Sequence, residues 1–193
     1  MITHRNRRGQ EYYLHEGKTK TGKVSYFFSR KTDGILAAAM PPGFEAYETG
    51  DGLIVLRRTI PCLVTSEEVT AVWTALKENA KARSAYIDAR GDAITVFMPD
   101  IDVEESTEDI VTRNPLPILN RKRLSTILER SQTFTPMMRF VLLDEKKREF
   151  TAKRWCFSSG IDDWVYIGNC GPLLKIARQF CRHLGRESFF ELM

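Results

Sequence analysis

The apolar residues of the first 60 positions follow a period of two, which is typical of β-strands. Residues 24–29 read Val-Ser-Tyr-Phe-Phe-Ser, and residues 11–15 form a shorter aromatic run. The polar, glycine-bounded segment 17–22 lies between these runs, so together they predict a hairpin with a lysine-rich tip. Residues 44–48 and 53–57 are two further strand candidates across a Thr-Gly-Asp-Gly turn. We therefore predict a small antiparallel β-module of four strands that ends near residue 60.

Helical spacing replaces the two-residue period after this module. Thr65 and Glu68 form a capping-box signature, and the apolar pattern that follows predicts a helix over residues 66–82. A second clear helix is predicted over residues 172–184, because Pro172 suits the first helical position and a glycine follows the end of the pattern.

Further strands are predicted between these two helices. They form two hairpins and one single strand, at residues 86–89, 93–98, 137–143, 149–157 and 164–167. The first hairpin turns at Arg-Gly-Asp. We interpret this tripeptide as a turn and not as an integrin-binding signal, because Gly-Asp supplies the backbone angles that hairpin turns need.

The middle of the chain has no clear period. Residues 100–109 are acidic, and Asn-Pro-Leu-Pro at 114–117 breaks regular structure, so we predict an extended loop or linker here. Asn120 can then cap a short helix. Strands do not alternate singly with helices, which favours an α+β fold over a doubly wound parallel sheet. The predicted domains are a basic, aromatic β-module at 1–60 and an α+β domain of β-hairpins packed with helices at 61–193.

Composition places the chain among ordinary globular proteins. It has 193 residues, of which 42% are hydrophobic and 28% charged. The longest apolar stretches are far shorter than the roughly 20 residues that span a bilayer, and the N-terminus does not resemble a secretory signal. The four cysteines contain no Cys-x-x-Cys pair, a pattern typical of buried, reduced thiols and not of a disulfide framework or zinc site. We therefore expect a cytoplasmic protein without a membrane partner.

Charge is distributed unevenly along the chain. The net charge is +4, but residues 1–31 alone carry eight Lys/Arg against two Glu, a balance of +6. The remaining residues therefore sum to −2. One end of the chain is predicted to form a positive patch on an otherwise nearly neutral protein.

This basic segment also contains several tyrosines and phenylalanines, and the combination of cations with aromatic rings suggests nucleic-acid binding. Lysine and arginine contacts to phosphates add salt-dependent affinity, and unpaired bases stack on aromatic rings with about 1–3 kcal/mol each. Small β-sheet DNA readers use a hairpin in a groove with a basic arm nearby. The predicted binding residues are Arg5, Arg7, Arg8, Tyr12, Lys18, Lys20, Lys23, Tyr26, Arg30 and Lys31. The alternative is that the aromatic residues form the core of a small sheet and the charges keep it soluble.

Two other functions remain open at this stage. The exposed surfaces could dock an acidic protein partner, in which case the chain is an interaction or accessory factor. Asp100, Asp102 and Glu104 could instead hold Mg²⁺ for nuclease chemistry. That acidic stretch can equally be a solvated loop, or pair with the basic arm. It does not match a calcium loop, because Glu105 and Val111 occupy positions that require Gly and Glu.

Other chemistry finds little support in the sequence. The segment 17–23 is not a phosphate-binding Walker loop, because Lys23 is followed by Val24 and a strand. His4, His15 and His183 have no metal-ligand spacing, and no nucleophile-elbow motif is present. Asp162-Asp163-Trp164 could line a ligand pocket, but we favour a turn in which the Asp side chains cap backbone amides and the tryptophan packs in the core. We therefore predict a non-enzymatic nucleic-acid or polyanion-binding protein, DNA or RNA, with no catalytic residues, metal or cofactor.

Overall fold

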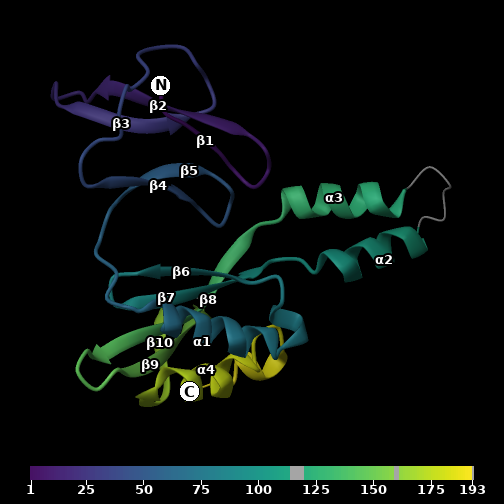
Figure 1. Ribbon diagram of the computed structural model, residues 1–193. Coiled ribbons are helices and arrows are strands. Elements are labelled where there is room, and N and C mark those ends of the chain that lie inside the picture. Colours follow the sequence, from purple (N-terminus) through teal and green to yellow (C-terminus); the bar gives the residue numbers. More distant parts are fainter. Residues whose placement is uncertain (114–119, 159–160, 193) are drawn as a thin grey trace. The chain divides into compact units, whose positions relative to one another are not determined.

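The computed structural model describes residues 1–113, 120–158 and 161–192, and it has an α+β architecture, as predicted (Figure 1). The chain divides into two compact units. Unit 1 contains residues 1–59 and 100–133, and unit 2 contains residues 60–99 and 134–193. The predicted break at 114–117 lies outside the described residues. The predicted domain boundary at residue 60 remains a prediction.

Unit 1 contains two small antiparallel sheets. One has the order β1-β2-β3, and the other pairs β4 with β5. The strands are β1 (Thr3–Arg5), β2 (Glu11–Lys18), β3 (Val24–Ser29), β4 (Phe44–Glu48) and β5 (Ile54–Arg58). The prediction of a single four-stranded module was therefore wrong. The sequence analysis missed β1 because its three residues are all polar or exposed and show no apolar alternation.

The core of the three-stranded sheet is small. Tyr12 and Leu14 are 5% and 0% exposed, and Leu14 pairs with Phe28 across the hairpin. On the opposite face His15 is also buried, where its Nε2 lies 2.8 Å from the carbonyl oxygen of Lys31 and its ring stacks on Phe27. Burial of these alternating side chains fixes the register of β2 against β3.

The acidic segment after residue 100 is helical and not an extended loop. α2 (Val103–Arg113) begins where the Asp102 carboxylate accepts hydrogen bonds from the backbone amides of Glu104 and Glu105, at 3.0 and 3.1 Å. Acidic side chains in a first helical turn are favourable near the positive end of the helix dipole. The acidic segment that we predicted to be a solvated loop therefore forms the N-terminus of a helix.

Asn120 caps the next helix, as predicted. Its side chain accepts from the amides of Lys122 and Arg123, and α3 (Arg121–Ser131) follows. α3 lies beside α2 (Figure 1), and an ion pair between Arg121 and Glu108 joins the two helices. None of the residues of α3 is buried.

Unit 2 is built on a five-stranded antiparallel sheet of order β10-β9-β8-β7-β6 (Figure 1). Its strands are β6 (Tyr86–Arg90), β7 (Ala93–Pro99), β8 (Phe134–Asp144), β9 (Glu149–Ser158) and β10 (Ile161–Pro172). The remaining elements are α1 (Ser66–Lys77), η1 (Ala80–Ala82), α4 (Leu173–Cys181) and η2 (Glu187–Phe189). Both predicted hairpins are confirmed, and the predicted single strand is the central part of β10.

One face of this sheet packs against α1 and α4 and forms the main core. Val72 and Leu76 of α1 and Phe180 of α4 meet Phe140 and Phe150 of the sheet, and all five are at most 4% exposed. The capping box at the start of α1 is confirmed. A large continuous core of this kind supplies most of the stability of a domain.

Two helix ends differ from their predictions. The predicted helix 66–82 ends at Lys77, because Asn79 turns inward and donates to the carbonyls of Cys181 and Leu184, both at 2.9 Å. Pro172 is the residue before α4 and not its first residue. These differences concern the helix ends only.

The cysteines correct a second expectation. Only Cys181 is buried, where burial raises the pKa of its thiol to about 12. Cys62 and Cys170 are exposed and Cys156 is half-buried, so core packing does not account for them. All four are free thiols. None of the helices in the described residues is both long and apolar enough to cross a membrane.

β10 contains an irregularity that requires glycine. The register of β10 against β9 shifts between Ile167 and Gly171. Within this shift Gly168 has a φ of +71°, and a Cβ atom there would lie 2.5 Å from Cζ of Phe180. Both the backbone angle and the close approach of the ring exclude a side chain.

Candidate nucleic-acid interface

The tip of the β2–β3 hairpin is a well-ordered turn. The amide of Thr19 donates to the carbonyl of Lys23 at 2.8 Å, and the amide of Gly22 donates to the carbonyl of Thr19 at 2.9 Å. Gly22 takes a left-handed φ of +80°, and no atom lies within 4 Å of the position that a Cβ would occupy. The hydroxyl of Thr19 accepts from the amide of Lys23 at 3.1 Å. The turn therefore presents its side chains from a fixed backbone.

Three lysines project from this tip. Lys18, Lys20 and Lys23 are all exposed, and within the described residues none of the three side chains has an ion pair or hydrogen bond. Tyr26 lies on the same face as Lys18, two residue pairs further along the hairpin, opposite Glu16. This group, which we call the lysine tip, combines unmatched positive charge with a half-buried aromatic ring.

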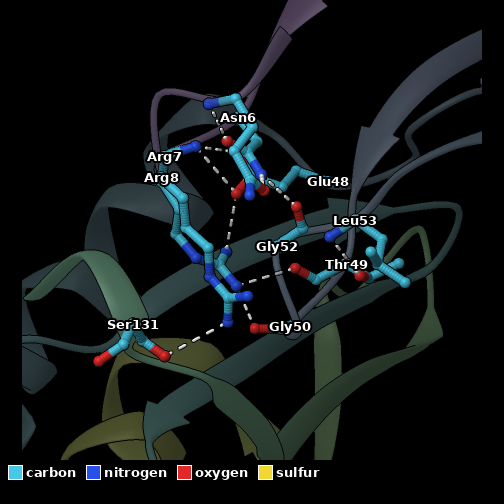
Figure 2. Close-up of polar contacts among 10 residues, drawn as sticks. Asn6, Arg7, Arg8, Glu48, Thr49, Gly50, Gly52, Leu53 and Ser131 are labelled. Carbon is cyan, nitrogen blue, oxygen red and sulfur yellow. Dashed lines mark hydrogen bonds and ion pairs between the residues drawn. The ribbon is translucent and has the colours of Figure 1, made fainter. Parts of the chain in front are cut away.

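The sequence suggested that Arg7 belongs to a free basic arm, but in the structure Arg7 is held by internal contacts. Its guanidinium forms an ion pair with Glu48 at 3.3 Å and donates to the carbonyls of Thr49 and Gly50 (Figure 2). Its backbone amide donates to the same carboxylate. Arg7 therefore holds the β1–β2 loop on the β4–β5 turn, and its charge is already matched.

The neighbouring residues take part in the same contact. Asn6 is 4% exposed and donates to the carbonyl of Gly52 at 2.6 Å, while its side-chain oxygen accepts from the amide of Gln10 at 2.8 Å (Figure 2). Arg8 donates to the carbonyl of Ser131 at 3.3 Å. Arg7 and Arg8 were predicted to contact phosphates, but in the structure both make contacts within the protein.

The remaining predicted residues lie at the far end of the sheet or inside it. Arg5 pairs with Glu11 at the start of β2, and Arg30 and Lys31 follow the end of β3. The length of β2 separates this end from the lysine tip by about 25 Å, at about 3.3 Å per residue. Tyr12 is 5% exposed, so its ring is not available for stacking in this structure. The predicted residues are thus divided among the lysine tip, the opposite end of the sheet and its interior, and they do not form one field.

The acidic residues considered for a metal have local partners. Asp102 caps α2, and the carboxylate of Asp100 accepts from the hydroxyl of Thr133 at 2.5 Å. In the part of the chain that the structure describes, no group of three or more His, Cys, Asp or Glu side chains could hold a metal ion. Among the described residues, Asp100, Asp102 and Glu104 therefore do not form the metal site that a nuclease function would need.

A second aromatic and basic surface escaped the sequence analysis. It lies on unit 2, where Lys153 and Trp155 of β9 face Tyr166 and Trp164 of β10. The signal was present in the alternation of β9, but we expected Trp164 to pack in the core. Instead, Asp163 and Trp164 belong to a strand.

Comparison with known proteins gives no match: no protein-family model, no curated protein and no solved structure resembles the chain. The functional proposals below therefore rest on the residues of this chain alone.

Proposed function

We propose that this protein is a non-enzymatic nucleic-acid-binding protein whose lysine tip contacts the phosphate backbone of DNA or RNA. The observation that carries the proposal is the gathering of Lys18, Lys20 and Lys23 on one exposed turn without an acidic partner in the described residues. Ammonium groups that lack internal partners release counterions when they meet phosphates, which favours binding to a polyanion.

The tip supports a modest, sequence-independent affinity. Lysine ammonium groups are mobile point charges that do not read base edges. Three phosphate contacts correspond to a salt slope of about −3 in a plot of log K against log salt. Tyr26 adds an aromatic ring on the face of Lys18, where an unpaired base can stack.

The test replaces the three lysines together. Lys18→Gln, Lys20→Gln and Lys23→Gln in one chain should lower the salt slope by up to about 3 and weaken binding at low salt. Binding is measured by fluorescence anisotropy with labelled duplex DNA and RNA, between about 50 and 200 mM salt. The matched control replaces Lys146, Lys147 and Lys175, which are equally exposed but lie in unit 2.

The control makes the result specific to the position of the charges, because both variants lose the same net charge. Equal loss in the two variants would show that net charge alone drives binding and would overturn the assignment to the tip. If the intact chain does not bind either nucleic acid at about 50 mM salt, the proposed function is wrong.

An acidic protein partner is the alternative that the same exposed lysines allow. A pull-down from nuclease-treated lysate separates the two, because a protein partner survives that treatment and a nucleic acid does not. We also propose a cytoplasmic location, which the four free thiols support.

A further inference from the structure

The outer face of the five-stranded sheet, opposite α1 and α4, carries aromatic and cationic side chains in neighbouring rows. Inward-pointing residues such as Phe140, Ala152 and Ile167 belong to the core, so their neighbours along each strand point outward. In one row Arg139 of β8 pairs with Lys153 of β9, which pairs with Tyr166 of β10.

The adjacent row on β9 and β10 is aromatic. Trp155 pairs directly with Trp164, and their rings meet edge to face with centroids 5.2 Å apart. We call Arg139, Lys153, Trp155, Trp164 and Tyr166 the outer aromatic face. All five come from strands of unit 2.

The two cations of this face lie over its rings. The guanidinium carbon of Arg139 is 4.2 Å from the centroid of Trp164, and Nζ of Lys153 is 4.1 Å from the centroid of Tyr166. Arg139 is held in place by donating from Nε to the hydroxyl of Thr95 at 3.1 Å. Tyr166 remains 60% exposed even with Lys153 over it. Both rings are therefore oriented, Tyr166 is largely uncovered, and Trp164 is half-buried with Arg139 over it.

The charge of this face suits an anion. On β8, β9 and β10 the two rows contain two cations and no carboxylate. Asp162 lies one row beyond Trp164, opposite Phe157. Asp88 of the edge strand β6 lies in the same row as Arg139, two strands away across Thr95, and it interacts electrostatically with Arg139, as does Asp92. A ligand over Trp164 and Tyr166 thus meets positive charge beside each ring.

We infer that the outer aromatic face binds single-stranded nucleic acid, with bases stacked on Tyr166 and Trp164 and the adjoining phosphates near Lys153 and Arg139. Aromatic side chains on an open antiparallel sheet are a recurring platform for unpaired bases. This surface lies on the other unit from the lysine tip, so the inference goes beyond the proposed function and does not depend on it.

The spacing of the rings favours an unpaired strand. Trp164 and Tyr166 are two residues apart on one strand, which separates their Cα atoms by about 6.7 Å. Bases of a duplex are stacked at about 3.4 Å. Two neighbouring bases can stack on the two rings only if they are splayed apart, and only an unpaired strand allows this.

The test titrates the full chain with a short oligothymidylate at about 50 mM salt, and binding is measured as quenching of tryptophan fluorescence. The background is the Lys18→Gln, Lys20→Gln, Lys23→Gln variant, so that the lysine tip does not contribute. Trp73→Phe removes the tryptophan of α1 from the signal, leaving Trp155 and Trp164 as reporters. We expect saturable quenching in this background, and weaker or absent binding of a blunt duplex of equal length.

Substitutions then assign the binding to the rings. Tyr166→Leu and Trp164→Leu, which keep apolar bulk but remove stacking, should each weaken binding by about 5- to 150-fold, whereas Trp164→Phe should retain most of it. Lys153→Gln should lower the salt slope by about 0.7. Phe190→Leu is the control, since Phe190 is a 57% exposed aromatic residue of the same unit outside the sheet.

The inference is overturned by any of three results. These are the absence of quenching in the tip-neutral background, unchanged affinity in both leucine variants, or equal binding of duplex and single strand with equal losses in the variants. Because the background already lacks the lysine tip, failure here leaves the proposed function standing. Conversely, quenching that persists when the tip proves inert supports this face alone.

Discussion

Two hairpin tips of this protein carry lysines, and only one of them has carboxylates directly beside its lysines in the sequence. At the β2–β3 tip, Lys18, Lys20 and Lys23 surround a glycine turn without a carboxylate among residues 17–23. At the β8–β9 tip, Lys146 and Lys147 are flanked by Asp144 and Glu145. Both turns carry lysines, but at the β8–β9 tip a further cation, Arg148, has its charge paired with Glu68.

The β8–β9 tip is tied to the body of unit 2. The Asp144 carboxylate accepts from the amides of Lys146 and Lys147, at 2.8 and 2.9 Å. Arg148 has a left-handed φ of 53°, and its guanidinium donates to both carboxylate oxygens of Glu68, at 2.9 and 2.5 Å. Lysine and arginine content alone therefore does not identify a binding site. What matters is whether the protein has already supplied the counter-charge.

The largest expected loss of stability comes from removing the contact between Glu68 and the β8–β9 tip. Glu68→Ala removes both the bidentate partner of Arg148 and the capping-box acceptor for the amide of Thr65, and should lower the free energy of unfolding by about 2 kcal/mol. Glu68→Gln keeps an acceptor for Thr65 and should lose about half of that. Urea unfolding followed by circular dichroism measures both.

Two controls keep this prediction specific. Glu67→Ala alters an exposed carboxylate in the same helical turn and should cost much less, and Lys20→Ala at the free tip should leave stability unchanged within about 0.5 kcal/mol. A Glu68→Ala chain as stable as the parent would show that the β8–β9 tip is not tied through this carboxylate.

A smaller effect is expected from the turn of the free tip. Gly22→Ala places a side chain at a φ of +80°, which costs about 1 kcal/mol from backbone conformation alone. No steric cost is added, because nothing lies within 4 Å of the position. Gly22→Asn should cost less, since asparagine tolerates this conformation. If alanine and asparagine cost the same in urea unfolding, the left-handed turn does not form in solution.

The smallest effect concerns pH. Burial acts to raise the pKa of Glu68, but the hydrogen bond from Arg148 and the backbone amide of Thr65 outweigh it, so the pKa is lowered. The stabilisation is therefore complete above the usual carboxyl pKa and is lost as the pH falls through the lowered folded-state value. Unfolding between pH 6 and pH 3, at about half-unit steps, should show a shallower acid loss in Glu68→Gln than in the parent. Parallel curves would contradict the assignment.

Local patterns predicted most of the fold of unit 2. The capping box at Thr65, the hairpins and the last helix each carry a signal within a few neighbouring residues, and the structure confirms them. Prediction failed where composition pointed the other way. The acidic segment after Asp100 looked like a solvated loop, but Asp102 makes it the start of a helix.

The candidate site was less predictable because it depends on long-range contacts. No local pattern shows that Arg7 would meet Glu48 or that Tyr12 would be buried while Tyr26 stays partly exposed. The same holds for Trp164, whose position on the outer face follows from the pairing of β10 with β9. The basic composition of residues 1–31 was visible in sequence, but its division into matched and unmatched charges required the fold.

The pairing of Pro99 with Phe134 has a consequence for the length of chain that this sheet can tolerate between two neighbouring strands. Because the ends of β7 and β8 are neighbours in the sheet, the segment between them leaves and re-enters at the same place. A two-residue turn could replace residues 100–133 and convert a distant strand pairing into a local one, which generally speeds folding. In protein-engineering terms this junction is a site where the inserted segment can be shortened or lengthened while the sheet keeps its register.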